Sequence, residues 1–188
     1  MEILVTAFEP FAGRGHNRSL DAVRLLARPG VATRMLPVSF ARLPGEVRSA
    51  VDDCQRALVL VGESGEARDL VLERVALNLI DARVADNDGE RPRGRPVVEG
   101  APLACHASWP TERLAARLRM AGYRAALSAH AGTFACNAAL YLALHHAATR
   151  PAPPLIGFVH LPASRWRGGD QRAADGLALL IEELLATG

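Results

Sequence analysis

The chain has 188 residues, of which 49% are hydrophobic and 22% charged, and this balance excludes a disordered or fibrous protein. A formal net charge of +2 and an aromatic content of 5% argue against nucleic acid as a partner. All 22 basic residues are arginine, so chemistry that needs a lysine, such as a Schiff base or a phosphate-loop lysine, is excluded. The length suits one domain over residues 1–188.

Three cysteines, Cys54, Cys105 and Cys136, are odd in number and widely separated. They form neither a disulfide framework nor a paired metal-binding motif, so we expect a reducing compartment and a cytoplasmic protein. The sequence lacks a basic leader followed by an apolar run, and it lacks an apolar stretch of about 18 residues, so we expect no membrane partner. The adjacent His-His and Cys-His pairs lack the spacing of metal ligands, so we expect no metal.

The first third of the chain alternates between short apolar strands and amphipathic helices. The expected strands cover residues 3–5, 31–38 and 57–61, and the expected helices carry residues 20–27 and 43–51. Ser19 is expected to cap the first of these helices, and Pro29-Gly30 to end it. The Gly13-x-Gly15 pair lacks the third glycine of a dinucleotide-binding loop. This alternation predicts an α/β fold.

After residue 62 the hydrophobic period changes to two, and it places a carboxylate on an apolar face. Glu73, Val75, Leu77 and Leu79 share that face. Since burial of an unpaired carboxylate is costly, Glu73 lies either at an exposed strand end or beside a partner. The turn-rich, arginine-bearing segment 86–100 is interpreted as a solvated loop or short hairpin and not as an anion site.

In the second half, Thr111 is expected to cap a helix that ends at Gly122 and leads into a strand over residues 124–128. Gly132 and Thr133 then turn the chain and cap a helix with a buried apolar stripe, formed by Ala139, Leu140, Ala143, Leu144 and Ala147. A strand over residues 155–160 follows, and Asp170 is expected to cap the last helix.

Cys136 is the first candidate for chemistry, because it falls in or beside the first turn of its helix. The unpaired N–H groups and the positive dipole end of a helix favour a thiolate there. The alternative is a small buried side chain that fills space under the helix. His160 ends the next strand, where it is either a structural group or a base. With Glu73 these two residues suit acyl transfer, as nucleophile, base and orienting carboxylate.

Four segments of the chain resemble the pyroglutamyl peptidase I (pyrrolidone-carboxylate peptidase) family of cysteine peptidases. These are "FEPFAGRGHNRS" at 8–19, "ERVALNLIDARVADNDGERP" at 73–92, "SAHAGTFACN" at 128–137 and "GFVHLP" at 157–162. The resemblance implies a Cys-His-Glu triad at Cys136, His160 and Glu73. It also implies a three-layer α/β/α sandwich with a mostly parallel, mixed sheet, no metal or organic cofactor, and hydrolysis of an N-terminal pyroglutamyl residue from peptides.

The resemblance also implies a binding pocket beside this triad. The backbone N–H of Cys136 and the side chain of Arg83 become candidates for stabilising the oxyanion. The candidates for binding the uncharged pyroglutamyl ring are Phe8, Phe11, Glu63, Phe134 and Ala135. Such a ring needs apolar walls and backbone partners, although core packing explains Phe8 nearly as well.

Three departures from the family pattern concern this pocket. Glu63 replaces a glutamine, and Arg18 replaces a common proline. The segment after Pro162 looks shortened, so this chain is expected to differ from the family in the rim of the pocket and in its homo-oligomeric assembly. A cysteine amidohydrolase for another small lactam or acylated amine, and a catalytically silent protein with the same fold, are the alternatives.

Overall fold

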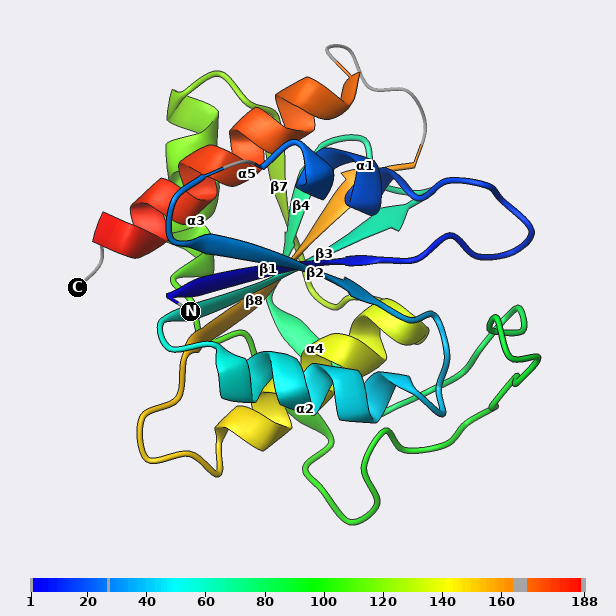
Figure 1. Ribbon diagram of the computed structural model, residues 1–188. Helices are drawn as coiled ribbons and strands as arrows, with labels where there is room; N and C mark the ends of the chain where they lie inside the picture. Colours follow the sequence, from blue (N-terminus) through cyan, green and yellow to red (C-terminus); the bar gives the residue numbers. More distant parts are fainter. Residues whose placement is uncertain (1, 27, 164–168, 187–188) are drawn as a thin grey trace.

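The structure, a computed structural model, describes residues 2–26, 28–163 and 169–186 (Figure 1). A six-stranded sheet lies between two layers of helices. The elements follow one another as β1 (Ile3–Phe8), α1 (Arg18–Arg24), β2 (Val31–Leu36), α2 (Leu43–Asp53), β3 (Ala57–Ser64), β4 (Leu70–Glu73), β5 (Val75–Leu77), β6 (Ala104–His106), α3 (Thr111–Met120), β7 (Ala125–Ser128), α4 (Ala135–Ala147), β8 (Leu155–Pro162) and α5 (Gly169–Ala186).

The sheet has the strand order β2-β1-β3-β8-β4-β7. Its pairs are parallel except for the antiparallel pair between β4 and β8, so β4 and β7 run against the other four strands. The predicted α/β/α sandwich with a mixed sheet is therefore confirmed. A separate pair, β5 with β6, is antiparallel.

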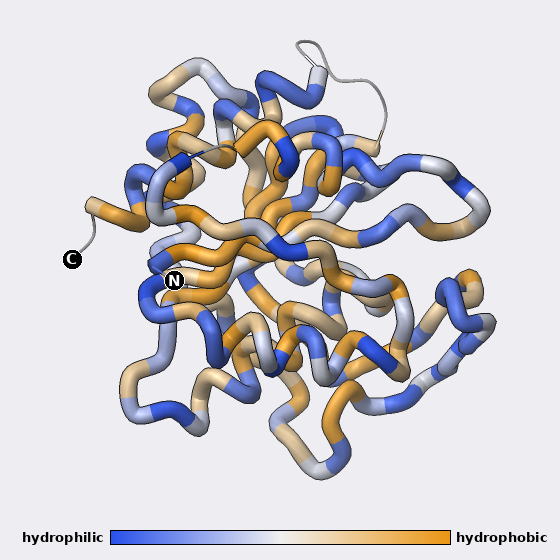
Figure 2. Tube along the Cα trace, in the orientation of Figure 1, coloured by the Kyte–Doolittle hydropathy of each residue, from blue (hydrophilic) through white to orange (hydrophobic). Residues whose placement is uncertain are grey.

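Alternating side chains of the central strands supply two hydrophobic cores, one on each face of the sheet. Ile3, Val5 and Ala7 pack with α1, α3 and α5, whereas Leu4 and Phe8 pack with α2 and α4. Because strand side chains alternate between faces, a strand covered on both sides reads as a continuous apolar run. Figure 2 shows the hydrophobic residues gathered along these strands. In residues 2–26, 28–163 and 169–186 we find no helix with the length and apolar character that a membrane span needs.

The predicted helix starts are wrong by one or two residues at three places, because the cap is set by backbone conformation. Asn17, not Ser19, caps α1, and its side chain accepts a hydrogen bond from the N–H of Ser19. Thr111 is the first residue of α3 and follows Pro110. Thr133 donates to the carbonyl of Asp81, and the extended residue before α4 is Phe134. Helix α1 also ends earlier than predicted, at Arg24.

The chain after Glu73 does not continue as one strand, which corrects the predicted two-residue period. Strand β4 ends at Glu73, and β5 begins after Arg74 in the other sheet. In β5 the buried residue is Ala76, between half-buried Val75 and Leu77. The segment 86–100 is a mostly exposed loop in which Asp86 is buried and Arg95 forms an isolated antiparallel bridge with Ile80. Asp170 lies in the first turn of α5, one residue after its start, and the shortened segment predicted after Pro162 falls largely at 164–168, outside the described residues.

Candidate active site

His160 and Glu73 meet because β4 lies antiparallel beside β8. Val71 pairs with His160 and Glu73 pairs with Phe158, so Glu73 and His160 are diagonal neighbours on one face of the sheet. The Nδ1 atom of His160 is 2.7 Å from Oε1 of Glu73. Glu73 is 3% exposed and His160 is 7% exposed. The buried carboxylate thus has a partner, which decides between the two interpretations of Glu73.

Cys136 lies beside this pair, as the second residue of α4, and it is half-buried. The N–H groups of a helical first turn have no acceptor within the helix, so they favour negative charge on a side chain there. A glycine makes room for the sulfur. A Cβ atom built on Gly62 would lie 2.9 Å from Sγ of Cys136 and 2.8 Å from Cζ of Phe158. Gly62 in turn pairs with His160 between β3 and β8.

The surroundings of His160 favour its charged form. Burial lowers the pKa of His160, but the charge of Cys136 and a side-chain hydrogen bond with it, followed by the hydrogen bond and charge of Glu73, raise this pKa to about 9. At neutral pH the arrangement therefore holds an imidazolium between the sulfur of Cys136 and the carboxyl group of Glu73. Such a histidine orients the nucleophile and can give a proton to a leaving group.

These three side chains line one cavity of about 600 Å³. Its walls also contain all five residues predicted to bind substrate, namely Phe8, Phe11, Glu63, Phe134 and Ala135. Arg83 is exposed and does not line the cavity, so its role as an oxyanion donor stays a prediction. The structure thus brings together every predicted site residue except Arg83.

Known proteins show the same sequence pattern and the same fold. A family model described as "Pyroglutamyl peptidase" matches residues 1–170. The chain belongs to the pyroglutamyl peptidase family. Pyrrolidone-carboxylate peptidase from Thermococcus kodakarensis is 37% identical over 176 residues, which cover 91% of this chain and 85% of the relative. The protein of the same name from Escherichia fergusonii is 35% identical over 98% of this chain and 91% of its own length.

Solved structures of pyroglutamyl peptidase relatives agree with this family membership. Pyrrolidone carboxyl peptidase from Thermus thermophilus has a TM-score of 0.87 and 32% identity, and the match covers 96% of this chain and 98% of that one. The enzyme from Pyrococcus furiosus, solved together with a cysteine-free mutant, has a TM-score of 0.89 and 30% identity over 99% of both chains.

The aromatic wall of the cavity is built in two layers. Phe11 and Phe134 lie with ring centroids 6.0 Å apart, and Phe40 meets Phe134 edge-on at 5.4 Å. Phe40 packs against Phe134 without lining the cavity, and its only signal in the sequence was a single aromatic residue in a turn. Phe8 is 2% exposed and belongs to the core, and it also lines the cavity, so its role in substrate binding stays a prediction beside its role in packing.

Two departures from the family pattern are joined by a hydrogen bond. The N–H of Arg18 donates to Oε2 of Glu63 at 2.8 Å. Proline, the residue common at position 18, has no N–H to donate. Arg14 forms an ion pair with the other carboxylate oxygen of Glu63. Glu63 therefore has polar partners of its own at the start of α1 and on the loop that precedes it.

Asn17 is a cavity residue that sequence reasoning missed. It is 1% exposed, caps α1 and donates from Nδ2 to the carbonyl of Glu9 at 3.1 Å. The signal that could have identified Asn17 is the strong preference of asparagine for the N-cap position of a helix. Asn137, directly after Cys136, was also missed. Its amide bonds the backbone of Leu77 and Leu79 and so ties that segment to α4.

The other two cysteines have different surroundings from Cys136. Cys54 is buried, and burial raises its thiol pKa. Burial also raises the pKa of half-buried Cys105. Within the described part of the chain, we find no group of three or more histidine, cysteine, aspartate or glutamate side chains arranged to hold a metal ion.

Proposed function

We propose that the protein is a cysteine exopeptidase that hydrolyses the N-terminal pyroglutamyl residue from peptides, with Cys136 as nucleophile, His160 as acid and base, and Glu73 as orienting carboxylate. The single observation that carries this assignment is the 2.7 Å contact of His160 with Glu73 in the cavity that also exposes Cys136. Membership of the pyroglutamyl peptidase family supports the choice of substrate.

The reaction proceeds through an acyl-enzyme. The thiolate of Cys136 attacks the carbonyl carbon that joins pyroglutamate to the next residue, and a C–S bond forms. As the tetrahedral intermediate collapses, the C–N bond breaks and the His160 imidazolium gives its proton to the departing amine. Neutral His160 then takes a proton from water, whose oxygen attacks the thioester and releases pyroglutamate and the thiolate. Glu73 accepts a hydrogen bond from Nδ1 and fixes the ring orientation throughout.

The negative charge on the tetrahedral intermediate needs hydrogen-bond donors. We assign the first to the backbone N–H of Cys136, because the N–H groups of a helical first turn have no acceptor within the helix. We assign the second to Arg83. Its side chain is exposed and does not line the cavity, so this role requires that Arg83 approach the bound substrate. Removal of one oxyanion donor costs about 10²–10³ in kcat in hydrolases of this kind.

The cavity suits an uncharged ring. Phe11 and Phe134 offer apolar surface for the faces of a five-membered lactam. Glu63 is already bonded to Arg18 and Arg14, so it does not act as an anchor for a free amino group. The lactam N–H and C=O are then left to backbone partners.

We also infer the setting in which the enzyme works. Its partners are N-terminally pyroglutamylated peptides, and it acts in the cytoplasm, where the free thiols of Cys54, Cys105 and Cys136 stay reduced. Exposed apolar side chains such as Leu103 and Met120, 89% and 77% exposed, are available for assembly into a homo-oligomer. Light scattering of the purified protein tests the assembly, and fractionation of the native cell tests the location.

Release of aminocoumarin from pyroglutamyl, prolyl and glutamyl conjugates tests the function. We expect turnover of the pyroglutamyl conjugate at a rate far above the other two. Comparable rates on all three would favour an amidohydrolase of broader specificity, and no turnover of any would favour a catalytically silent protein. Cys136→Ala must abolish turnover while circular dichroism shows an unchanged fold, and Cys105→Ala serves as the matched control.

A further inference from the structure

A buried charge forms part of the wall of the cavity. Glu63 lines the cavity, and its side chain is 3% exposed. An ionised carboxylate at such a place is stable only with partners, because burial removes its hydration. Its partners are the N–H of Arg18 at 2.8 Å and the guanidinium of Arg14. The Arg18 partner is a backbone N–H, whereas the Arg14 partner is a positively charged guanidinium.

Arg14 is held in place by a tight turn. Its N–H donates to the carbonyl of Phe11 at 3.2 Å, and the two residues between them, Ala12 and Gly13, have φ angles of 54° and 72°. This turn folds the side chain of Arg14 back, so that its guanidinium carbon lies 4.6 Å from the centroid of the Phe11 ring. The same arginine thus covers a substrate-binding ring and neutralises a substrate-binding carboxylate.

We propose that Arg14 is a specificity-determining positioning residue, which keeps the acyl pocket selective for an uncharged lactam by neutralising Glu63. This inference rests on the proposed function. An N-terminal prolyl residue has the same five-membered ring as pyroglutamate, but it carries a secondary ammonium where pyroglutamate has an amide N–H. A carboxylate that is free of Arg14 attracts this ammonium, whereas a neutralised one gives it no advantage over the lactam.

The two members of the pair are not equivalent, which gives the inference a directional test. The Arg14 side chain is 36% exposed, whereas the Glu63 side chain is 3% exposed. Loss of Arg14 leaves a charge inside the wall, but loss of the Glu63 charge leaves a guanidinium that water can still solvate. We therefore expect Arg14→Gln to lower kcat/KM for the pyroglutamyl conjugate more than Glu63→Gln does.

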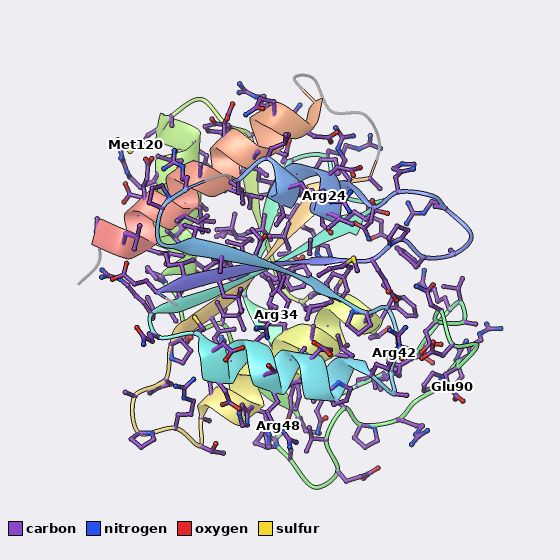
Figure 3. All side chains as sticks on the ribbon, in the orientation of Figure 1. Arg24, Arg34, Arg42, Arg48, Glu90 and Met120 are labelled. Carbon is purple, nitrogen blue, oxygen red and sulfur yellow. The ribbon has the colours of Figure 1, made fainter. Side chains whose placement is uncertain are left out.

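The experiment compares Arg14→Gln, Glu63→Gln and the double variant on pyroglutamyl-aminocoumarin and prolyl-aminocoumarin. Arg14→Gln should lower kcat/KM for the pyroglutamyl conjugate about tenfold, mainly through KM, and raise the prolyl-to-pyroglutamyl ratio by at least a similar factor. Adding Glu63→Gln should reverse both changes, because it removes the uncompensated charge. Arg48→Gln is the control, since Arg48 is an exposed arginine on α2 (Figure 3).

An unchanged substrate ratio in Arg14→Gln, or a double variant no better than Arg14→Gln, would overturn the role of Arg14. If Arg14→Gln does not fold, Arg14→Lys replaces it: lysine keeps the charge, so selectivity must stay within about threefold of the parent protein. A larger loss of selectivity in that variant would contradict the charge argument. An inactive parent protein contradicts the proposed function instead, so the two failures are distinguishable.

Discussion

Glu73 and His160 are 87 residues apart in the chain, yet their side chains share a buried contact of 2.7 Å. The antiparallel register of β4 and β8 creates this contact, because it makes the two residues diagonal neighbours on one face of the sheet. The carboxylate is thus held by two strands of the central sheet and not by a loop. In the proposed triad, the orienting carboxylate is therefore fixed by the sheet.

Glu73→Gln tests the charge of this member, because glutamine keeps the shape but loses the negative charge. We expect kcat for the pyroglutamyl conjugate to fall about 10²–10⁴-fold, since the His160 imidazolium is then less stabilised and less well oriented. Steady-state kinetics measure the effect, and Glu99→Gln, on an exposed loop, is the control. A loss of less than threefold would remove Glu73 from the mechanism.

The pH profile of kcat/KM tests the pKa of His160, which is raised to about 9. The leaving amine needs the imidazolium proton, so kcat/KM should fall as pH rises through about 9. Glu73 is one of the groups that raise this pKa. In Glu73→Gln the pKa of His160 is therefore lower, and the falling limb should move to lower pH. A limb that stays in place or moves upward contradicts this electrostatic role.

Gly62→Ala tests the space beneath the sulfur. The added Cβ would lie 2.9 Å from Sγ of Cys136 and 2.8 Å from Cζ of Phe158, so at least one of these side chains must move. Since small misplacements of a nucleophile cost about 10²-fold in rate, we expect a loss of that order. We also expect a lower melting temperature, because the added Cβ overpacks buried Phe158. Gly45→Ala is the control, because a Cβ there meets nothing within 4 Å. Full activity in Gly62→Ala would show that the position of Cys136 does not depend on the missing side chain at Gly62.

Local sequence signals predicted most of the fold. The predictions of β1, β3 and β8 as apolar runs and of α2 and α4 as helical stripes are correct. Burial on both faces leaves a continuous apolar run, and burial of one stripe leaves a helical period. The predicted helix caps are wrong at Ser19, Thr111 and Thr133. Asn17 competes with Ser19 as a polar capping residue, whereas Pro110 and Phe134 occupy the other two cap positions without a side-chain cap hydrogen bond. Only the φ and ψ angles of the folded chain distinguish them.

The partners of the charged residues in the site could not be predicted from the sequence, because they are set by contacts between distant segments. Whether Glu73 was exposed or paired depended on the neighbour of β4 in the sheet, and no local pattern encodes strand order. The same holds for the pair of Arg14 with Glu63, whose members come from a loop and from the end of β3. The sequence of each segment shows which side chains can carry charge, but the order and register of the strands determine which of them meet.

Gly157→Ala tests the packing on the opposite face of β8. A Cβ on Gly157 would lie 1.8 Å from Cε2 of Trp109, whose side chain is in the core. We expect the free energy of unfolding in urea to fall by about 1–3 kcal/mol or more, as in other overpacked cores. In a Trp109→Leu background the same change should cost less, because the smaller side chain leaves room. Equal costs in both backgrounds would mean that Trp109 is not the obstacle.

Iodoacetamide at pH 6.5 tests the nucleophile itself, because the thiolate is the reacting form. An ordinary thiol, with a pKa of about 8.5, reacts slowly at this pH. Burial raises the pKa of both Cys54 and Cys105, so these two should react more slowly still. Cys136 lies in the first turn of a helix, where the N–H groups favour negative charge on a side chain, and the His160 imidazolium lies beside its sulfur.

The measurement is the rate of alkylation at each cysteine, followed by peptide mass spectrometry. Cys105 is the matched comparison, because both it and Cys136 are half-buried. We expect Cys136 to react at least about tenfold faster than Cys105, and His160→Ala to remove most of this difference. Equal rates at Cys136 and Cys105 in the parent protein would contradict an activated nucleophile. An advantage that survived His160→Ala unchanged would instead assign the activation to the helix N-terminus alone.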